Sequence, residues 1–424
     1  MSFVRIRPGA VFGRLRAPAS KSYTHRALVV GHLAHRPFRV LRPLDSGDTR
    51  ATASALQHLG TSVHREAEVW HLSPSSRRPG QGAVRIQCHE SGTTLRFVSA
   101  IAGLEDRTTV ISGEGRLSSR PIDPLLAALK TLGATCRHTR GRGLPIEVRG
   151  PMHGGSVSLD ASESSQFASA LLLAMPTLSE NSVLELTGKV VSRPYLEATL
   201  AVLAYHGIRV ARHGRRFRIA GGQHFRGRQF LVPGDASSAA YLWAAASVSG
   251  GRVRVDGVGE SWPQADLAVL DLLESAGANV ERSKGGVEVS AGRPRPFRVD
   301  LTDAPDLYSL AGVLAATTPG ESRITGAEHV ALKESNRKAA TAQLARRLGG
   351  KVDERPSGLT IRGTSRPKAV ELPRLSDHRL VMSAAVGALA ASGPSIVGER
   401  QAVRKSYPGF WRALREIADG GYVS

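Results

Sequence analysis

An internal repeat of about 72 residues constrains the fold of this chain more than any other feature. Amphipathic stretches of helical periodicity end at glycines that are 73, 74, 70, 72 and 72 residues apart. A glycine placed just after the last periodic residue favours a left-handed helix C-cap. A fixed period of this length indicates that each repeat is one supersecondary unit packed against its neighbours. The repeated glycines are Gly60, Gly133, Gly207, Gly277, Gly349 and Gly421.

A second type of helix recurs with the same period. These segments are small and apolar on nearly all sides, which predicts buried helices. Short strands of period-two alternation follow most of the glycines, so the chain is expected to contain six βαβαββ-like units. A solenoid is one arrangement of such units, but the Pro/Gly-marked junction at 229–234 favours two groups of three. The apolar helices are expected to begin near Ser20, Gly92, Ser164, Asp235, Asp306 and Asp377.

Composition excludes several protein classes. With 424 residues, 41% hydrophobic and 22% charged, the chain can form large cores and is not a disordered polymer. No apolar run reaches the roughly 18 residues that span a bilayer, and residues 1–16 lack the apolar stretch of a secretory signal. Only Cys88 and Cys136 occur, which excludes a disulfide scaffold and fits a reducing cytoplasm.

The formal net charge is +21, from 57 basic and 36 acidic residues. Two explanations stay open for this excess. A positive field attracts polyanions or small anionic substrates. The arginines are scattered, however, with neither a basic tail nor interleaved aromatic residues, so the excess is equally well explained as a compositional bias toward arginine.

Cations stand at the expected starts of the buried helices. Lys21, Arg26, Arg96 and Arg379 lie in the first turns, where the helix dipole disfavours positive charge. Capping alone explains Ser, Thr or Asp at such positions but not Lys or Arg. A bound anion between the cation and the helix end would remove the conflict. The sequence therefore predicts helix ends that bind carboxylate or phosphate groups.

Each of the charged motifs also has a simpler explanation. Lys21, Ser22 and Arg26 could form a solvated basic turn, and Ser164 could be a plain N-cap that leaves Ser165 and Gln166 unexplained. The segment 333–337 could be an ion-pair helix on the surface. If it instead lies in a site, Glu334 and Asp306 are candidates for an acid and a base, while Arg337 and Arg379 can make bidentate contacts with anions.

Several common sites have no motif here. The sequence contains no P-loop, no complete dinucleotide-binding fingerprint and no H-E-x-x-H pair. It also lacks the G-x-S-x-G nucleophile elbow and any Cys/His cluster. We therefore expect neither a metal nor a cofactor.

Ten motifs in order resemble those of the 5-enolpyruvylshikimate-3-phosphate (EPSP) synthase family over essentially the whole length. Any one of them is modestly specific, but ten in sequence and in phase with the repeat are highly specific. The form Ser-Lys-Ser-Tyr-Thr-His-Arg is similar to that of archaeal members. The motifs are P-x-S-K-S-x-x-x-R (18–26), S-G-T-x-x-R (91–96), R-x-x-x-R-P (116–121), S-S-Q-F (164–167), S-R-P-Y (192–195), G-D-A-S-S (234–238), P-D (305–306), K-E-S-x-R (333–337), D-H-R (377–379) and K-S-Y-P (405–408).

The resemblance implies an α/β fold with two globular domains, each an inside-out α/β barrel of three βαβαββ repeats. The active site would lie in the interdomain cleft. One domain is expected to comprise 1–16 plus 231–424, on the phosphoenolpyruvate side, and the other 17–230, on the shikimate 3-phosphate side. The first strand would belong to the C-terminal domain, so that the chain passes from one domain to the other twice.

The resemblance also implies the reaction of a 3-phosphoshikimate 1-carboxyvinyltransferase. The enolpyruvyl group of phosphoenolpyruvate would move to the 5-hydroxyl of shikimate 3-phosphate, and phosphate would be released. Catalytic roles would fall to Lys21, Asp306 and Glu334. Shikimate 3-phosphate would contact Lys21, Ser22, Arg26, Ser164, Ser165, Gln166, Ser192, Tyr195, Asp306 and Lys333. Phosphoenolpyruvate would contact Lys21, Gly92, Arg120, Gln166, Arg337, Arg379 and Lys405.

Four positions depart from the common bacterial pattern. Glu90 and His329 stand where Asn is usual, Asn336 replaces Asp, and Arg193 replaces Lys. None of these changes removes a residue that the chemistry requires, but they leave the roles of Glu90 and His329 open.

Two alternatives remain to be weighed. A UDP-N-acetylglucosamine enolpyruvyl transferase would carry a cysteine in the loop before the Arg-Pro pair, whereas residues 113–117 contain none. A basic nucleic-acid-binding repeat protein would need its arginines on one continuous face. We therefore expect a cytoplasmic, monomeric enzyme that acts on two small phosphorylated acids and binds no nucleic acid or membrane.

Overall fold

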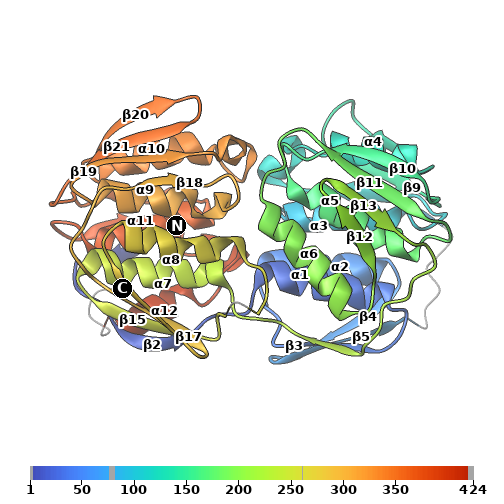
Figure 1. Cartoon of the computed structure of the whole chain (residues 1–424), viewed down its shortest axis with the longest axis horizontal. Helices are drawn as coiled ribbons and strands as arrows, with labels where there is room; N and C mark the ends of the chain where they lie inside the picture. Colours follow the sequence, from blue (N-terminus) through green and yellow to red (C-terminus); the bar gives the residue numbers. More distant parts are fainter. Residues whose placement is uncertain (1–2, 76–81, 260, 419–424) are drawn as a thin grey trace. The chain divides into compact units, whose positions relative to one another are not determined.

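The computed structural model describes residues 3–75, 82–259 and 261–418 of the chain (Figure 1). Contacts between residues divide the chain into two compact units. Unit 1 comprises Met1–Pro18 and Pro233–Ser424, and unit 2 comprises Ala19–Val232. The chain therefore passes from one unit to the other twice.

Unit 2 contains three four-stranded sheets, each with one parallel strand pair and two antiparallel pairs. The strand orders are β14-β3-β5-β4, β6-β7-β9-β8 and β10-β11-β13-β12. The elements are α1 (Lys21–Leu33), β3 (Phe38–Leu41), α2 (Gly47–His58), β4 (Thr61–Arg65), β5 (Val69–Pro74), β6 (Val84–Gln87), α3 (Gly92–Ala102), β7 (Thr109–Ser112), α4 (Asp123–Thr131), β8 (Thr135–His138), β9 (Ile146–Arg149), β10 (Ser156–Asp160), α5 (Ser165–Ala174), β11 (Ser182–Thr187), α6 (Arg193–Tyr205), β12 (Val210–His213), β13 (Arg216–Ile219) and β14 (Gln229–Leu231), with 3₁₀ turns η1 (Gly115–Ser119) and η2 (Met175–Thr177).

Unit 1 repeats this plan, with sheets β16-β17-β15-β2 and β18-β19-β21-β20 and, among its described residues, a third of three strands, β1-β23-β22. The elements are β1 (Val4–Ile6), β2 (Phe12–Arg16), α7 (Ala236–Ser249), β15 (Arg252–Asp256), α8 (Ala268–Ser275), β16 (Asn279–Ser283), β17 (Gly286–Ser290), β18 (Arg298–Asp300), α9 (Tyr308–Ala316), β19 (Gly320–Thr325), α10 (Arg337–Arg347), β20 (Lys351–Arg355), β21 (Gly358–Gly363), β22 (Glu371–Leu372), α11 (His378–Leu389), β23 (Ser395–Val397) and α12 (Phe410–Ile417), with 3₁₀ turns η3 (Ala265–Leu267), η4 (Pro305–Leu307), η5 (Glu328–Leu332) and η6 (Ala402–Lys405).

The units exchange their first strands. By its position in the repeat, β2 should open the sheet of β3, but it pairs in parallel with β15, with Gly13 opposite Val253. Strand β14 takes its place beside β3, with Phe230 opposite Val40. In Figure 1 the blue β2 lies beside β15, which comes from the middle of the chain.

Buried helices form the core of each unit. In unit 2, α1, α3 and α5 contact one another, and in unit 1 α7, α9 and α11 do so. Every residue of α9 and α11 is buried, which confirms the prediction from their uniform apolarity. These helices supply much of the apolar area removed from water, the main stabilising contribution to folding.

Most of the predicted helix starts are confirmed to within a residue. Ser164, Asp235 and Asp377 are the N-cap residues of α5, α7 and α11, and each accepts a hydrogen bond from the backbone N–H two residues later. Near Asp306 the helix begins with a 3₁₀ turn. Residues 305–307 form the 3₁₀ turn η4, and α9 begins only at Tyr308. The carboxylate of Asp306 engages arginine side chains instead of capping α9.

The second set of helices ends where the glycine spacing predicts. Gly60, Gly133, Gly207, Gly277 and Gly349 have φ values of 93°, 98°, 78°, 98° and 97°, which are left-handed. Gly421 lies outside the described residues. None of the described helices has the combined length and apolarity that crossing a bilayer requires.

Candidate active site

Arg337 is the centre of a buried ion cluster in unit 1. Its Nη1 donates to Asp306 Oδ1 at 3.0 Å, and its Nη2 donates to Glu334 Oε2 at 2.6 Å. Its Nε donates to Asp377 Oδ2 at 3.0 Å. The residue is 1% exposed, so the segment 333–337 is not the surface ion-pair helix that its sequence also allowed. One guanidinium thus orients three carboxylates from three different segments.

Arg379 extends this cluster toward α7. Its Nη2 donates to Asp306 Oδ2 at 2.5 Å, and its Nη1 lies 3.5 Å from the hydroxyl of Tyr241. Asp306 therefore bridges two guanidinium groups, one on each carboxylate oxygen. Lys405 Nζ lies 3.9 Å from Glu334 Oε1 and adds a third cation. Five of the predicted residues, namely Asp306, Glu334, Arg337, Arg379 and Lys405, are brought together in this way.

Burial and charge oppose each other in this cluster. Burial works against a charge on Arg337, but Asp377, Glu334 and Asp306 outweigh it and raise the pKa of Arg337. Burial alone would also raise the pKa of Asp377, yet the adjacent Arg337 lowers it to about 2. Asp377 further accepts from Ser335 Oγ at 2.7 Å and from the backbone N–H of Arg379 at 3.0 Å. Arg337 and Asp377 therefore both stay charged near neutral pH.

Lys21 in unit 2 has a carboxylate partner. Its Nζ donates to Asp48 Oδ2 at 3.0 Å, with both side chains largely buried. Beneath this pair, His25 Nδ1 lies 2.7 Å from Thr52 Oγ1, which in turn lies 2.7 Å from Thr94 Oγ1. Burial lowers the pKa of His25 to about 3, so its ring is neutral at neutral pH.

Arg26 is a buried cation held mainly by uncharged groups. Its Nε donates to Thr199 Oγ1 at 2.9 Å, its Nη1 to the carbonyl of Ser22 at 2.9 Å and its Nη2 to the carbonyl of Tyr195 at 2.7 Å. Burial lowers the pKa of Arg26 to about 10, which leaves the guanidinium charged at neutral pH. These bonds bring the start of α6 to α1 and place Ser22 and Tyr195 around one positive charge.

Gly92 lies at a point of close approach to arginines. A Cβ atom at this position would lie 2.8 Å from the guanidinium carbon of Arg120 and closer still to Arg96, so a side chain would collide with both. Gln166 Nε2 donates to Thr93 Oγ1 at 3.0 Å and thereby joins α5 to the start of α3. The predicted residues Gly92, Arg120 and Gln166 therefore occupy one region of unit 2.

Three serines mark the starts of α5 and α6. Ser164 Oγ accepts from the backbone N–H of Gln166 at 3.2 Å, so it is the N-cap of α5, and Ser165 is the first helical residue. Ser192 precedes α6 and has a φ of 57°, a left-handed conformation that costs a non-glycine residue of order 1–3 kcal/mol. Such strain is found most often at functional sites.

Comparison with known proteins identifies the family. The sequence model described as EPSP synthase (3-phosphoshikimate 1-carboxyvinyltransferase) matches residues 6–414. This chain belongs to the EPSP synthase family. A 3-phosphoshikimate 1-carboxyvinyltransferase of Halobacterium salinarum (strain ATCC 29341 / DSM 671 / R1) is 41% identical over 418 residues, which cover 96% of this chain and 97% of the relative. One of Methanocella arvoryzae is 39% identical over 416 residues, which cover 97% and 98%.

The fold is shared with solved EPSP synthases. The 2.37 Å structure of EPSP synthase from Acinetobacter baumannii superposes with a TM-score of 0.83 over 100% of this chain and 99% of that chain. The sequences are only 22% identical, so this comparison concerns the fold alone. The predicted α/β fold of the EPSP synthase family is confirmed.

One departure from the common bacterial EPSP synthase pattern has a structural explanation. Asn336 is the N-cap of α10, and its Oδ1 accepts from the backbone N–H of Ala339 at 3.2 Å. Asn and Asp are equally good at this task, so the replacement is neutral for the helix. His329 is buried in η5, whereas Glu90 is exposed in the turn before α3. The replacements at Glu90 and His329 have no structural explanation.

Sequence reasoning missed three residues that bear on these clusters. Asp48 pairs with Lys21, Tyr241 contacts Arg379, and Asp266 is a buried carboxyl that accepts from Ser237. Asp48 stands in the first turn of α2, where an acidic residue is expected from the helix dipole alone. Tyr241 lies within an apolar helix, so its sequence context predicts only that it belongs to the hydrophobic core. Of the three, only Asp266 could have been noticed in the sequence, because it is an acidic residue between apolar ones.

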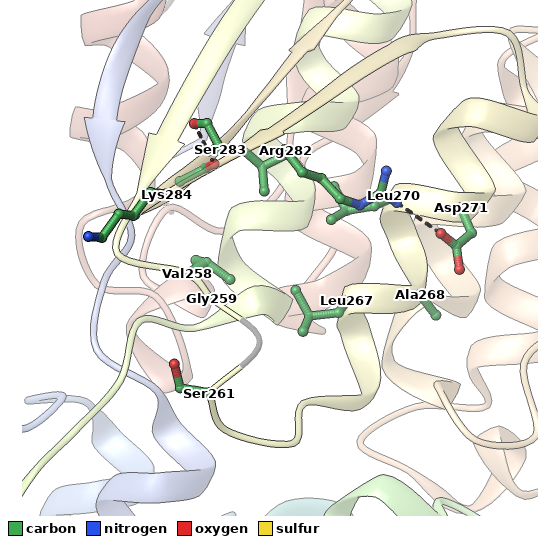
Figure 2. A pocket seen from close by; sticks show the side chains of 13 residues that line it. Val258, Gly259, Ser261, Leu267, Ala268, Leu270, Asp271, Arg282, Ser283 and Lys284 are labelled. Carbon is green, nitrogen blue, oxygen red and sulfur yellow. Dashed lines mark hydrogen bonds and ion pairs between the residues drawn. The ribbon is translucent and has the colours of Figure 1, made fainter.

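Unit 1 also contains a cavity of about 700 Å³, shown in Figure 2. It lies between α8, the β16–β17 hairpin and the preceding loop, and the Arg282–Asp271 ion pair borders it. None of the predicted site residues lines it, so it is a separate feature. Within the described ranges, no group of three or more His, Cys, Asp and Glu side chains is placed to hold a metal ion.

Proposed function

We propose that this chain transfers the enolpyruvyl group of phosphoenolpyruvate to the 5-hydroxyl of shikimate 3-phosphate and releases phosphate. Membership of the EPSP synthase family supports the reaction, since the family model and relatives of about 40% identity bear the name 3-phosphoshikimate 1-carboxyvinyltransferase. The observation that carries the proposal is the buried cluster in which Arg337 and Arg379 orient the carboxylates of Asp306 and Glu334.

Unit 2 would hold shikimate 3-phosphate. Ser22 and Arg26 would bind its carboxylate, and Ser164, Ser165 and Ser192 its phosphate. The cationic groups and backbone N–H groups at the starts of α1 and α5 suit these anions. Gln166 and Tyr195 would line the same pocket, and from unit 1 Asp306 and Lys333 would reach the ring hydroxyls.

Phosphoenolpyruvate would be held by cations and by close backbone approach. Lys21, Gly92, Arg120 and Gln166 from unit 2 would act with Arg337, Arg379 and Lys405 from unit 1. We therefore assign residues of both units to one reaction. Guanidinium groups suit this task because they bind carboxylate and phosphate in a bidentate geometry.

The chemistry requires one base and one acid. Asp306 would accept the proton of the 5-hydroxyl group while the oxygen of that hydroxyl bonds to the central carbon of phosphoenolpyruvate. Glu334 or Lys21 would donate a proton to the methylene carbon, giving a tetrahedral intermediate. Loss of a proton from the new methyl group and departure of phosphate would then restore the double bond. This addition and elimination balances without a metal or redox cofactor.

The proposal also covers the setting of the enzyme. We infer a cytoplasmic monomer, and the two free, buried cysteines support a reducing compartment. The proposed domains, 1–16 plus 231–424 and 17–230, end two residues before the boundaries of the contact units. No nucleic acid or membrane takes part in this function.

Phosphate release tests the proposal directly. Purified protein is mixed with shikimate 3-phosphate and phosphoenolpyruvate, and each substrate is omitted in turn. We expect phosphate release only with both substrates. Release from phosphoenolpyruvate alone would indicate a phosphatase. Tight, strongly salt-dependent DNA binding without any phosphate release would favour the nucleic-acid-binding alternative.

A further inference from the structure

Thr94 is the centre of a buried hydroxyl network to which the proposed function gives no role. It lies in the first turn of α3 and is fully buried. Its Oγ1 lies 2.7 Å from Thr52 Oγ1 and 2.7 Å from Ser91 Oγ, and it donates to the backbone carbonyl of Asp48 at 3.3 Å. Asp48 and Thr52 are four residues apart on α2. One side chain of α3 therefore contacts α2 at two successive turns.

Two contacts join the same part of α2 to α1. Lys21 Nζ donates to Asp48 Oδ2 at 3.0 Å. One turn further on, His25 Nδ1 lies 2.7 Å from Thr52 Oγ1. Lys21 and His25 are also four residues apart, so they share a face of α1. The ion pair and the hydrogen bond thus lie one helical turn apart, and Thr94 contacts the α2 partner of each.

The acceptors in this network determine its direction. A carbonyl oxygen only accepts, so the hydroxyl proton of Thr94 points to the carbonyl of Asp48. Thr94 then accepts from Thr52, whose own proton is used in that bond, and Thr52 accepts from His25 Nδ1. Burial lowers the pKa of His25 to about 3, so its ring is neutral and carries one proton, which this chain of bonds places on Nδ1. Each donor from His25 onward therefore supports the contact between Thr94 and Asp48.

The first turn of α2 matters because Asp48 holds Lys21, to which the proposed function assigns a catalytic role. Both side chains of this ion pair are largely buried. A lysine has a flexible stem and a compact charge, so its position depends on the group that anchors it. Thr94 connects that anchor to Ser91, the N-cap of α3, and so to the neighbouring Gly92, which would bind phosphoenolpyruvate.

We propose that Thr94 is a positioning residue that fixes Asp48, and through it Lys21, relative to the start of α3 where phosphoenolpyruvate would bind. This inference rests on the function proposed above. Without the hydroxyl of Thr94, the first turn of α2 is free to shift, and Lys21 spends less time in its reactive position. A displacement of about 1 Å is enough to lower a rate by about 10²-fold. The proposal therefore predicts a loss of catalytic efficiency while the fold is retained.

The test compares two substitutions of Thr94 in the full-length enzyme. Thr94→Val keeps the shape of the side chain and removes the hydroxyl, whereas Thr94→Ser keeps the hydroxyl. Phosphate release is measured with varied phosphoenolpyruvate at saturating shikimate 3-phosphate. We expect kcat/KM for phosphoenolpyruvate to fall on the order of tenfold in Thr94→Val and to stay within about twofold of the wild type in Thr94→Ser.

Thr61→Val is the matched control for the loss of a buried hydroxyl. Thr61 is buried in unit 2, and its Oγ1 lies 2.7 Å from Nδ1 of His32, near the other end of α1. This pair repeats the chemistry of the contact between Thr52 and His25 but involves no proposed site residue. We expect Thr61→Val to lower the free energy of unfolding in urea, as Thr94→Val does, and to leave kcat/KM unchanged.

A double-mutant cycle separates positioning from a general loss of stability. Asp48→Asn removes the charge that anchors Lys21, so the hold of Thr94 on the backbone of α2 no longer acts on the lysine. Thr94→Val should therefore lower kcat/KM by less than about twofold in the Asp48→Asn background, whereas independent effects would give the full loss again.

Near-normal kcat/KM in Thr94→Val, equal losses in Thr94→Val and Thr94→Ser, or additive losses in the cycle would each overturn the inference. Where Thr94→Val does not fold, Thr52→Val replaces it, because it removes the donor to Thr94, and we expect a several-fold fall in kcat/KM. Failure of both variants to fold would assign the network to stability and equally overturn the inference. An active wild type with these negative results leaves the proposed function standing, whereas an inactive wild type refutes that function.

Discussion

The two units share one repeat but differ in how they treat buried cations. In unit 1, Arg337 and Arg379 are paired with carboxylates. In unit 2, Lys21 has Asp48, but Arg26 donates to hydroxyl and carbonyl oxygens. The same fold therefore supports a cluster of paired charges in one unit and a buried guanidinium held by neutral groups in the other.

This difference suits the proposed division of labour. A buried cation held by neutral groups at a helix start suits the binding of a phosphorylated acid, whereas alternating charges fix a base and an acid at defined positions. The scaffold supplies only the helix ends. The side chains at those ends determine which chemistry each unit performs.

The largest effect should come from removing a proposed proton-transfer group in unit 1. Glu334→Gln keeps the side-chain shape but cannot exchange the proton, so kcat should fall by about 10²–10⁴. The matched control is Glu354→Gln, which breaks an exposed ion pair with Arg346 in the same unit. Steady-state phosphate release measures both variants. Near-normal turnover of Glu334→Gln, with intact circular dichroism, would break the assignment.

Stability should separate the two kinds of buried arginine. Arg337→Met leaves three carboxylates without their common partner and should lower the free energy of unfolding by about 3–5 kcal/mol. Arg26→Met leaves only neutral acceptors and should cost about 1–3 kcal/mol. Urea titration of both variants checks the order. Equal losses would show that the surrounding carboxylates do not distinguish the two sites.

A hydroxyl in unit 2 should affect one substrate only. Ser165→Ala removes a proposed donor to the phosphate of shikimate 3-phosphate, worth about 1.5–3 kcal/mol, so KM for that substrate should rise by about 10- to 150-fold. KM for phosphoenolpyruvate should change little. Ser158→Ala, an exposed serine on β10, is the control. A rise confined to phosphoenolpyruvate would reverse the assignment of the units.

The smallest effect concerns the buried His25 beneath Lys21. Its pKa is lowered by burial from 6.5 to about 3, so the unfolded chain binds a proton in this range that the folded protein does not. The contribution is fully present above pH 6.5 and is lost as the pH falls toward 3, at about 1.4 kcal/mol per pH unit. His25→Asn should weaken the drop in Tm between pH 7 and 5.5, whereas His64→Asn, at an exposed position, should not. Parallel drops in both variants would contradict the argument.

Periodicity made much of the fold predictable. The glycine spacing located the ends of α2, α4, α6, α8 and α10, because a left-handed C-cap depends on local backbone sterics. The uniform apolarity of α9 and α11 likewise predicted burial. The start near Asp306 was found, but not that its first turn is 3₁₀. The carboxylate of Asp306 bonds to arginines far along the chain, and local capping rules do not include such partners.

The site was predictable only as a set of residue types. Cations at helix starts indicated anion binding, but the sequence could not show that Lys21 and Arg379 already contact Asp48 and Asp306. Arg337 and Asp377 are 40 positions apart, and nothing in their local sequence indicates that they meet. Long-range pairing is decided by packing, which periodicity does not encode. The roles of these residues therefore stay predictions.

The exchange of first strands has a consequence for synthesis on the ribosome. Residues 19–232 include every described strand of the three sheets of unit 2, so that unit can complete its hydrogen-bonded ladders as soon as β14 emerges. The opening strands must wait much longer, since β2 needs β15 and Val4 pairs with Val397 near the end of the chain. An unpaired strand is a template for aggregation. The nascent N-terminus therefore stays exposed as a possible site of aggregation for longer than the strands of unit 2.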